Sequence, residues 1–211
     1  MNIIANLSSA LTIGIAFCGC TYQAQVQDAP SYNLVTNYEN KIPGLWFLYI
    51  DSTGLQRPIK PSSFVCSAHK FPITASGPFE SSVRQTLNNV FEIVEAVTSP
   101  VTGNEIKSRA ARGLIVVRGE EVRAKLDAKP GYWTASMEGQ ATLVASVYVN
   151  SASGRVMGTT FEGTAIKEAD AGAMCGGGAA ALGEAVTEAM RDAMRKMGEA
   201  LSNSERVRTI R

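Results

Sequence analysis

The feature that most constrains the fold is a regular alternation of side chains over Met137–Val149. Small or apolar residues occupy the odd positions, and mostly polar residues occupy the even ones. A period of two predicts a strand with one buried face. Asn150–Gly154 has the composition of a hairpin loop, and apolar or small residues return at alternate positions over Met157–Ala165. The sequence therefore predicts a long antiparallel hairpin with one face that must be covered.

The C-terminal part of the chain is expected to form a helix that covers this face of the hairpin. A helix is expected over about residues 179–202. Its apolar stripe repeats every three or four residues and is rich in Ala and Met: Leu182, Val186, Ala189, Ala193, Met197 and Leu201. Small side chains in such a stripe allow a helix to approach a sheet closely.

Further elements complete the expected order β-β-α-β-(α)-β-β-β-α. A helix beginning near Ser76 would present Phe79, Val83, Leu87 and Phe91 on one face. A short helix is expected within 105–112. Strands are predicted at Leu45–Ile50, Ser63–Ile73, Ile93–Val97 and Leu114–Val117. The following stretch, Val122–Leu126, alternates with Arg123 and Lys125. The predicted class is α+β, a mixed or antiparallel sheet with helices packed on one face and a long C-terminal helix.

Composition excludes several functional classes. The chain has 20 Lys and Arg against 19 Asp and Glu, a formal net charge of +1, so no basic surface for nucleic acid is expected. It has 1 His, which excludes sites built from several histidines. Hydrophobic residues make up 45% of the chain, enough for a folded core.

The first nineteen residues contain no charged side chain, and their apolar run is too short to span a bilayer. They fit a secretory signal peptide. The run ends in Phe17-Cys18-Gly19-Cys20, which resembles the lipobox of bacterial lipoproteins. The resemblance implies cleavage between Gly19 and Cys20, a diacylglycerol on the Cys20 thiol and acylation of the new amino terminus. The alternatives are an ordinary cleaved signal and a retained anchor helix.

The resemblance also implies a location. Thr21 follows the cysteine, and the absence of Asp at this position resembles lipoproteins sorted to the outer membrane of diderm bacteria. Residues 20–43 are rich in Gln, Asn, Tyr and Pro without an apolar period, so we expect a lipidated N-terminus and a flexible tether, or an edge strand near Tyr32–Val35. The remaining chain divides into a periplasmic α+β domain at 44–203 and a basic tail at 204–211, which would be solvated or contact an anionic surface.

Two cysteines remain after removal of Cys18 and acylation of Cys20. Cys66 and Cys175 are an even number of thiols in an oxidising compartment, which favours a disulfide between them. The alternative is a pair of buried free thiols.

No catalytic, metal or cofactor site is predicted. His69 is the only candidate base, and no nucleophile-elbow motif accompanies it. Cys66 and His69 have a metal-like spacing but too few partners for a zinc site. Gly176–Ala181 formally fits a dinucleotide-binding pattern, but the residues before it do not form a hydrophobic strand, so close packing at a helix entry is expected instead.

The element order over about residues 44–201 is similar to small periplasmic lipoproteins of the curli-secretion type, to lipoprotein activators of penicillin-binding proteins and to the N-terminal domain of the Tol-system propeller protein. This resemblance implies a non-enzymatic binding or envelope-assembly module, held at the membrane by its lipid and acting on an envelope protein. The alternatives are a homo-oligomeric component of an outer-membrane machine and an envelope hydrolase that depends on His69.

Overall fold

The computed structural model describes residues 20–59, 66–131, 135–172 and 175–210. Residues 1–19, with the expected signal peptide and Gly19, lie outside this range, so signal cleavage stays a prediction. Among the described residues, no helix is both long and apolar enough to cross a membrane.

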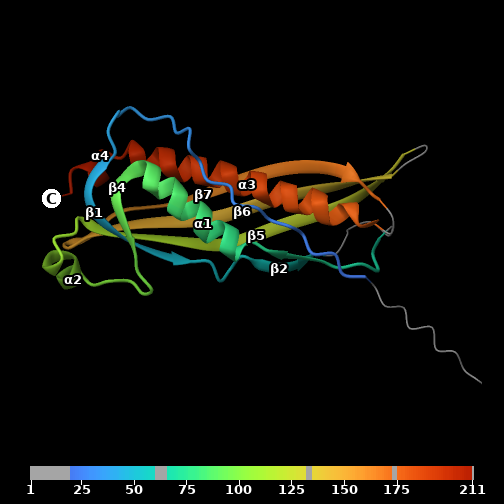
Figure 1. Ribbon diagram of the computed structural model, residues 1–211, viewed down its shortest axis with the longest axis horizontal. Helices are drawn as coiled ribbons and strands as arrows, with labels where there is room; N and C mark the ends of the chain where they lie inside the picture. Colours follow the sequence, from blue (N-terminus) through green and yellow to red (C-terminus); the bar gives the residue numbers. More distant parts are fainter. Residues whose placement is uncertain (1–19, 60–65, 132–134, 173–174, 211) are drawn as a thin grey trace, which may run out of the picture.

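The architecture is a five-stranded mixed sheet with helices, and the predicted α+β class is confirmed (Figure 1). The strand order is β4-β1-β5-β6-β7, with β1 parallel to both of its neighbours and β5, β6 and β7 joined antiparallel. The strands are β1 (Ile42–Asp51), β4 (Phe91–Ala96), β5 (Gly113–Pro130), β6 (Ala135–Ser151) and β7 (Gly154–Asp170).

The two longer helices, α1 (Ser76–Val90) and α3 (Gly177–Ser202), cover one face of the sheet and enclose the main core (Figure 1). The short α2 (Gly103–Ser108) begins with a capping box formed by Thr102 and Glu105. It packs on the opposite face, where Ile106 joins a smaller cluster with Phe47, Leu114 and Val116. The expectation of helices on one face therefore holds for α1 and α3, and α2 is an addition on the other side.

Glycines in β6 and β7 set the distance between the sheet and α3. A Cβ at Gly139 would lie 2.7 Å from the carbonyl carbon of Ala181. A Cβ at Gly163 would meet the carbonyl oxygen of Ala189 and lie 2.7 Å from the backbone nitrogen of Ala193. Since real Cβ atoms do not approach so closely, α3 rests backbone to backbone on these two strands.

A single long strand, β5, contains both the strand expected at 114–117 and the alternating stretch at 122–126. The register of β5 against β6 shifts between Gly119 and Glu121. Such a bulge adds one residue and reverses which positions face the core. Val117 before the bulge and Val122 after it are both buried, although their positions differ in parity.

A small second sheet lies at one end of the molecule. It pairs β2 (Gln56–Ile59) with β3 (Phe71–Thr74) in antiparallel register. The expected strand at Ser63–Ile73 is therefore wrong in its bounds, because Cys66–Ala68 form a turn and residues 60–65 lie outside the described part. Phe91 was expected on the helix face, but it begins β4 with an extended backbone.

Residues 20–41 form a segment that we call the N-terminal strap, which runs across α1 and α3 (Figure 1). Its backbone N–H groups donate to hydroxyl oxygens on these helices: Ala29 to Ser82 at 2.8 Å, and Ser31 to Thr86 at 3.0 Å. Ala29 is fully buried. The expectation of a flexible tether over residues 20–43 is therefore wrong, as is the alternative strand at Tyr32–Val35, because the strap is held by hydrogen bonds to helix side chains.

The C-terminal residues are also docked. Ser204 caps α4 (Glu205–Arg208), and Val207 and Ile210 are buried. The Arg208 guanidinium lies 3.9 Å from the centre of the Tyr38 ring and donates to the carbonyl of Asn40. The expectation of a solvated basic tail at 204–211 is therefore wrong for the described residues, because the strap binds the Arg208 guanidinium.

Candidate functional site

Cys20 is an exposed free thiol at the start of the strap, and its backbone is fixed to Lys70, the residue before β3. The N–H of Lys70 donates to the carbonyl of Cys20 at 3.3 Å, and the N–H of Tyr22 donates to the carbonyl of Lys70 at 3.0 Å. The Tyr22 ring stacks on Phe71 with the ring centroids 5.8 Å apart. A group attached to Cys20 would therefore sit directly against the folded domain.

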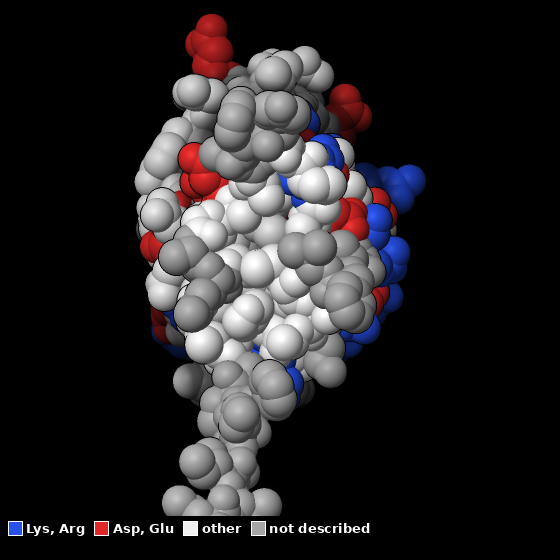
Figure 2. Space-filling view, turned by 90° about the vertical axis from the view of Figure 1, so that its right-hand side faces the viewer, with Lys and Arg blue, Asp and Glu red and all other residues white. Residues whose placement is uncertain are grey.

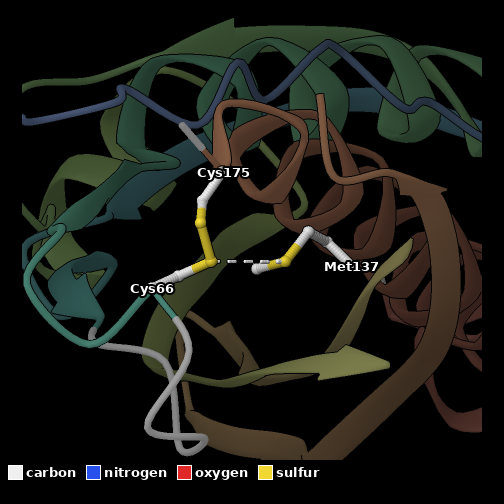
Figure 3. Close-up of a disulfide and its surroundings, with 3 residues drawn as sticks. All are labelled: Cys66, Met137 and Cys175. Carbon is white, nitrogen blue, oxygen red and sulfur yellow. Dashed lines mark hydrogen bonds between the residues drawn. A yellow bond between two sulfur atoms is a disulfide. The ribbon is translucent and has the colours of Figure 1, made fainter. Parts of the chain in front are cut away.

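A disulfide lies at the same end of the molecule (Figure 3). It joins Cys66, in the turn before β3, to Cys175 at the entry of α3, with the Cα atoms 5.9 Å apart. The pairing is the one that the sequence favours. Both cysteines have a positive φ, 69° and 67°, a backbone conformation that few residues other than glycine adopt. The Sδ atom of Met137 packs 4.0 Å from the Cys66 sulfur.

Among the described residues, the surface of this end, which we call the disulfide end, carries little charge at its centre (Figure 2). The described Lys, Arg, Asp and Glu residues lie mostly around its rim. Ser67 and Ala68 in the turn after Cys66, and Gly172 near Cys175, are exposed and uncharged. Lys70, which holds the backbone of Cys20, is exposed and charged. An exposed cysteine near a described surface of low charge is compatible with a position at a lipid bilayer.

His69 stands near Cys20 but lacks a catalytic arrangement in the described structure. Its ring lies edge-on to Tyr22 with the centroids 5.5 Å apart. Its Nδ1 atom is buried and has no hydrogen-bond partner among the described residues. The pKa of the neighbouring Tyr22 is raised by desolvation, and further by the charge and hydrogen bond of Cys20. The described geometry thus gives His69 no nucleophile at Nδ1.

The glycine-rich segment Gly176–Ala181 lies at the beginning of α3, as expected. A Cβ at Gly178 would lie 2.7 Å from a Leu126 methyl and 2.9 Å from the Phe71 ring. The preceding strand β7 is antiparallel to β6, so no βαβ unit surrounds this segment. Within the described residues, no group of three or more His, Cys, Asp or Glu is placed to hold a metal ion.

A second candidate site is a groove beside β7, the last strand of the sheet. Its volume is about 690 Å³. One wall is the strap at residues 30–33, another is β7 at 164–167, and a third is the charged face of α3. Two large hydrophobic side chains are exposed along it, Tyr32 at 64% and Ile166 at 62%.

Sequence reasoning missed this groove, although one signal was available. Ile166 follows the polar parity of β7, between Thr164 and Glu168, so it breaks the alternation that Phe161, Gly163 and Ala165 keep. An apolar residue on the solvent face of an edge strand can be found from sequence. The strap wall cannot, because residues 30–33 are brought there by distant contacts.

The sequence matches no protein-family model and no curated protein. Three solved structures illustrate the similarity in shape. Protein XCC0632 of Xanthomonas campestris, from family DUF330, is 12% identical with a TM-score of 0.43, covering 84% of this chain and 94% of its own. A Helicobacter pylori neuraminyllactose-binding hemagglutinin homologue is 13% identical with a TM-score of 0.48, covering 86% and 94%.

The third is a PelC dodecamer from Paraburkholderia phytofirmans, 11% identical with a TM-score of 0.37, covering 88% of this chain and 96% of the PelC chain. All three TM-scores lie below 0.5, so these likenesses assign the chain to no family.

Proposed function

We propose that this chain is a bacterial lipoprotein, acylated on Cys20, whose domain works as a non-enzymatic binding module of the cell envelope. The observation that carries the proposal is the place of Cys20, exposed and held at the disulfide end, whose described centre carries little charge. Two or three acyl chains on one residue are enough for stable membrane attachment.

The fixed strap gives the anchor a consequence for orientation. Since Cys20 is hydrogen-bonded to Lys70, the residue before β3, the acyl chains would leave the domain without a spacer. The disulfide end then faces the bilayer, and the opposite end, with α2 and the β6–β7 turn, points away from it (Figure 1). In a diderm bacterium, Thr21 favours the outer membrane, with the domain in the periplasm.

A binding role agrees with the β7 groove and with the arrangement of His69. The groove offers an open strand edge and exposed apolar side chains, which are means of recognising a polypeptide. The hydrolase alternative depends on His69. Replacing His69 with Gln and finding that the cellular function is lost while folding is retained would favour the hydrolase.

Metabolic labelling tests the anchor. Cells expressing the full chain are given labelled palmitate, and the protein is immunoprecipitated. We expect label in the wild type and in the double variant Cys66→Ser/Cys175→Ser, and no label in Cys20→Ser. Absence of label from the wild type, or its retention in Cys20→Ser, would contradict the proposal.

A further inference from the structure

We propose that the outer edge of β7 binds an extended segment of a partner protein, added to the sheet as a further strand. The segment would carry basic side chains on both sides of an apolar one, at alternate positions. This inference deepens the proposed binding role by naming the class of partner, and it does not depend on acylation of Cys20.

The edge is open where the groove lies. β7 is the last strand in the order and pairs with β6 alone in the sheet. The carbonyl of Glu162 accepts from the Lys196 ammonium at 2.6 Å, so Glu162 can offer an added strand its side chain but not this carbonyl. Among the described residues, no backbone of another segment pairs with the outer edge at 164–168. Unpaired strand edges are templates for strand addition.

The side chains beside this edge give a defined recognition pattern. Glu162, Thr164, Ile166 and Glu168 share one parity and therefore one face of β7. All four residues are exposed. Ile166 offers an apolar contact, and the two carboxylates lie on either side of it.

The carboxylates at this edge have no cationic partner in the described structure. Glu162 and Glu168 have no ion pair within 4.0 Å among the described residues. Glu168 accepts a hydrogen bond from the Ser136 hydroxyl. The cations nearby are paired with other carboxylates: Lys196 with Asp192 at 2.7 Å, Arg123 with Glu121 at 2.8 Å, and Lys129 with Glu138. A partner strand with Lys or Arg opposite Glu162 and Glu168 would place opposite charges directly across the ladder, which stabilises pairing.

A second copy of this chain fits the edge less well. Two β7 strands related by a two-fold axis would pair antiparallel. Centred on Ala165, such a pair brings Glu162 of one copy opposite Glu168 of the other. Centred on Ile166, it brings Glu162 opposite Asp170. Like charges directly opposite each other destabilise a strand pair, so we infer a different, basic partner.

Two peptides test the inference on the full-length chain in detergent. The probes are fluorescent peptides, one Lys-Thr-Val-Thr-Thr-Thr-Lys and the other with Glu in place of both Lys. Antiparallel addition places the terminal residues opposite Glu168 and Glu162 and Val opposite Ile166. Fluorescence anisotropy should give the basic peptide an affinity about tenfold or more above the acidic one. Glu162→Lys/Glu168→Lys should reverse this preference.

Ile166→Lys should weaken the basic peptide, because it removes the apolar contact and adds a like charge. Ile93→Lys is the matched control, since Ile93 is 53% exposed on β4, the strand at the other edge. This variant should bind as the wild type does. Equal affinity for both peptides, or an unchanged preference in the reversed variant, would overturn the inference. Sedimentation showing a dimer that Ile166→Lys abolishes would also overturn it, in favour of a second copy.

The outcome is separable from the anchor proposal. Peptide discrimination with no palmitate on Cys20 would support the β7 site and contradict the lipoprotein assignment. Palmitate on Cys20 with no discrimination would do the reverse.

Discussion

At the residue scale, the fold depends on positions where a side chain is missing. Gly163 is the clearest, because α3 passes it at backbone distance. The small side chains of Ala189 and Ala193 meet it from the helix, and both are fully buried. The Ala-rich stripe of α3 and the glycines of the hairpin therefore pack against each other and together allow the close approach of helix and sheet.

Gly163→Ala should lower the free energy of unfolding by about 1–3 kcal/mol, because the added methyl must push α3 away from β7. Gly77→Ala is the matched control. Gly77 lies in α1 with no atom within 4 Å of a built Cβ, so alanine there should be neutral or stabilise by about 0.5–1 kcal/mol. Urea unfolding of both variants with the disulfide intact measures the difference. Equal stabilities would show that α3 does not rest on Gly163 as described.

At the element scale, the strap is the unexpected component. It begins at Cys20, crosses α3 where the N–H of Gln27 donates to Thr187 at 3.0 Å, and then crosses α1 at Ser82 and Thr86. Ser82 and Thr86 are buried polar residues of the core, and their hydroxyls are explained by the strap. These side chains hold the strap at Ala29 and Ser31, whereas Cys20 itself is held by Lys70.

Ser82→Ala and Thr86→Val should each destabilise the protein by about 1–3 kcal/mol, because each leaves a buried strap N–H without an acceptor. The amides of Ala29 and Ser31 should also exchange with solvent faster. Ser81→Ala is the control, since its hydroxyl contacts Asp28 at the surface, and little change is expected. Hydrogen exchange of individual amides, measured by NMR, gives both the loss of stability and the faster exchange of Ala29 and Ser31. Rapid exchange of Ala29 and Ser31 already in the wild type would mean that the strap is detached in solution.

The sequence predicted the elements that depend on local periodicity and missed those that depend on distant contacts. The β6–β7 hairpin, α1 and α3 each repeat a pattern within their own residues. The strap does not, because the hydrogen bonds of Ala29 and Ser31 reach residues 53 and 55 positions away. The bulge in β5 changes which positions face the core, so the strand predicted at 114–117 did not reveal the full length of β5. At the candidate sites, Cys20 could be identified from its resemblance to a lipobox, and Cys66 and Cys175 as the two remaining thiols, whereas the groove required the strap to be in place.

At the scale of the whole molecule, the strap and the long hairpin, with the proposed anchor at Cys20, define a direction. The disulfide end carries Cys20, and β6 leads from Ala135 at that end to the turn around Ser153 at the other. Ala181 on α3 contacts Gly139, twelve residues before Ser151 along β6. At ~3.3 Å per residue, an exposed site at Ala180 and one at Ser153 are separated along the sheet by about 40 Å.

In the proposed orientation, acylated Cys20 holds the domain against the bilayer by its disulfide end. Spin labels test this orientation directly. One variant carries the label on Ala180→Cys and another on Ser153→Cys, and each acylated protein is bound to vesicles with nickel-chelating headgroups. We expect the headgroup nickel to relax the label at residue 180 strongly and the label at residue 153 only slightly. Equal relaxation at both residues, or stronger relaxation at residue 153, would contradict it.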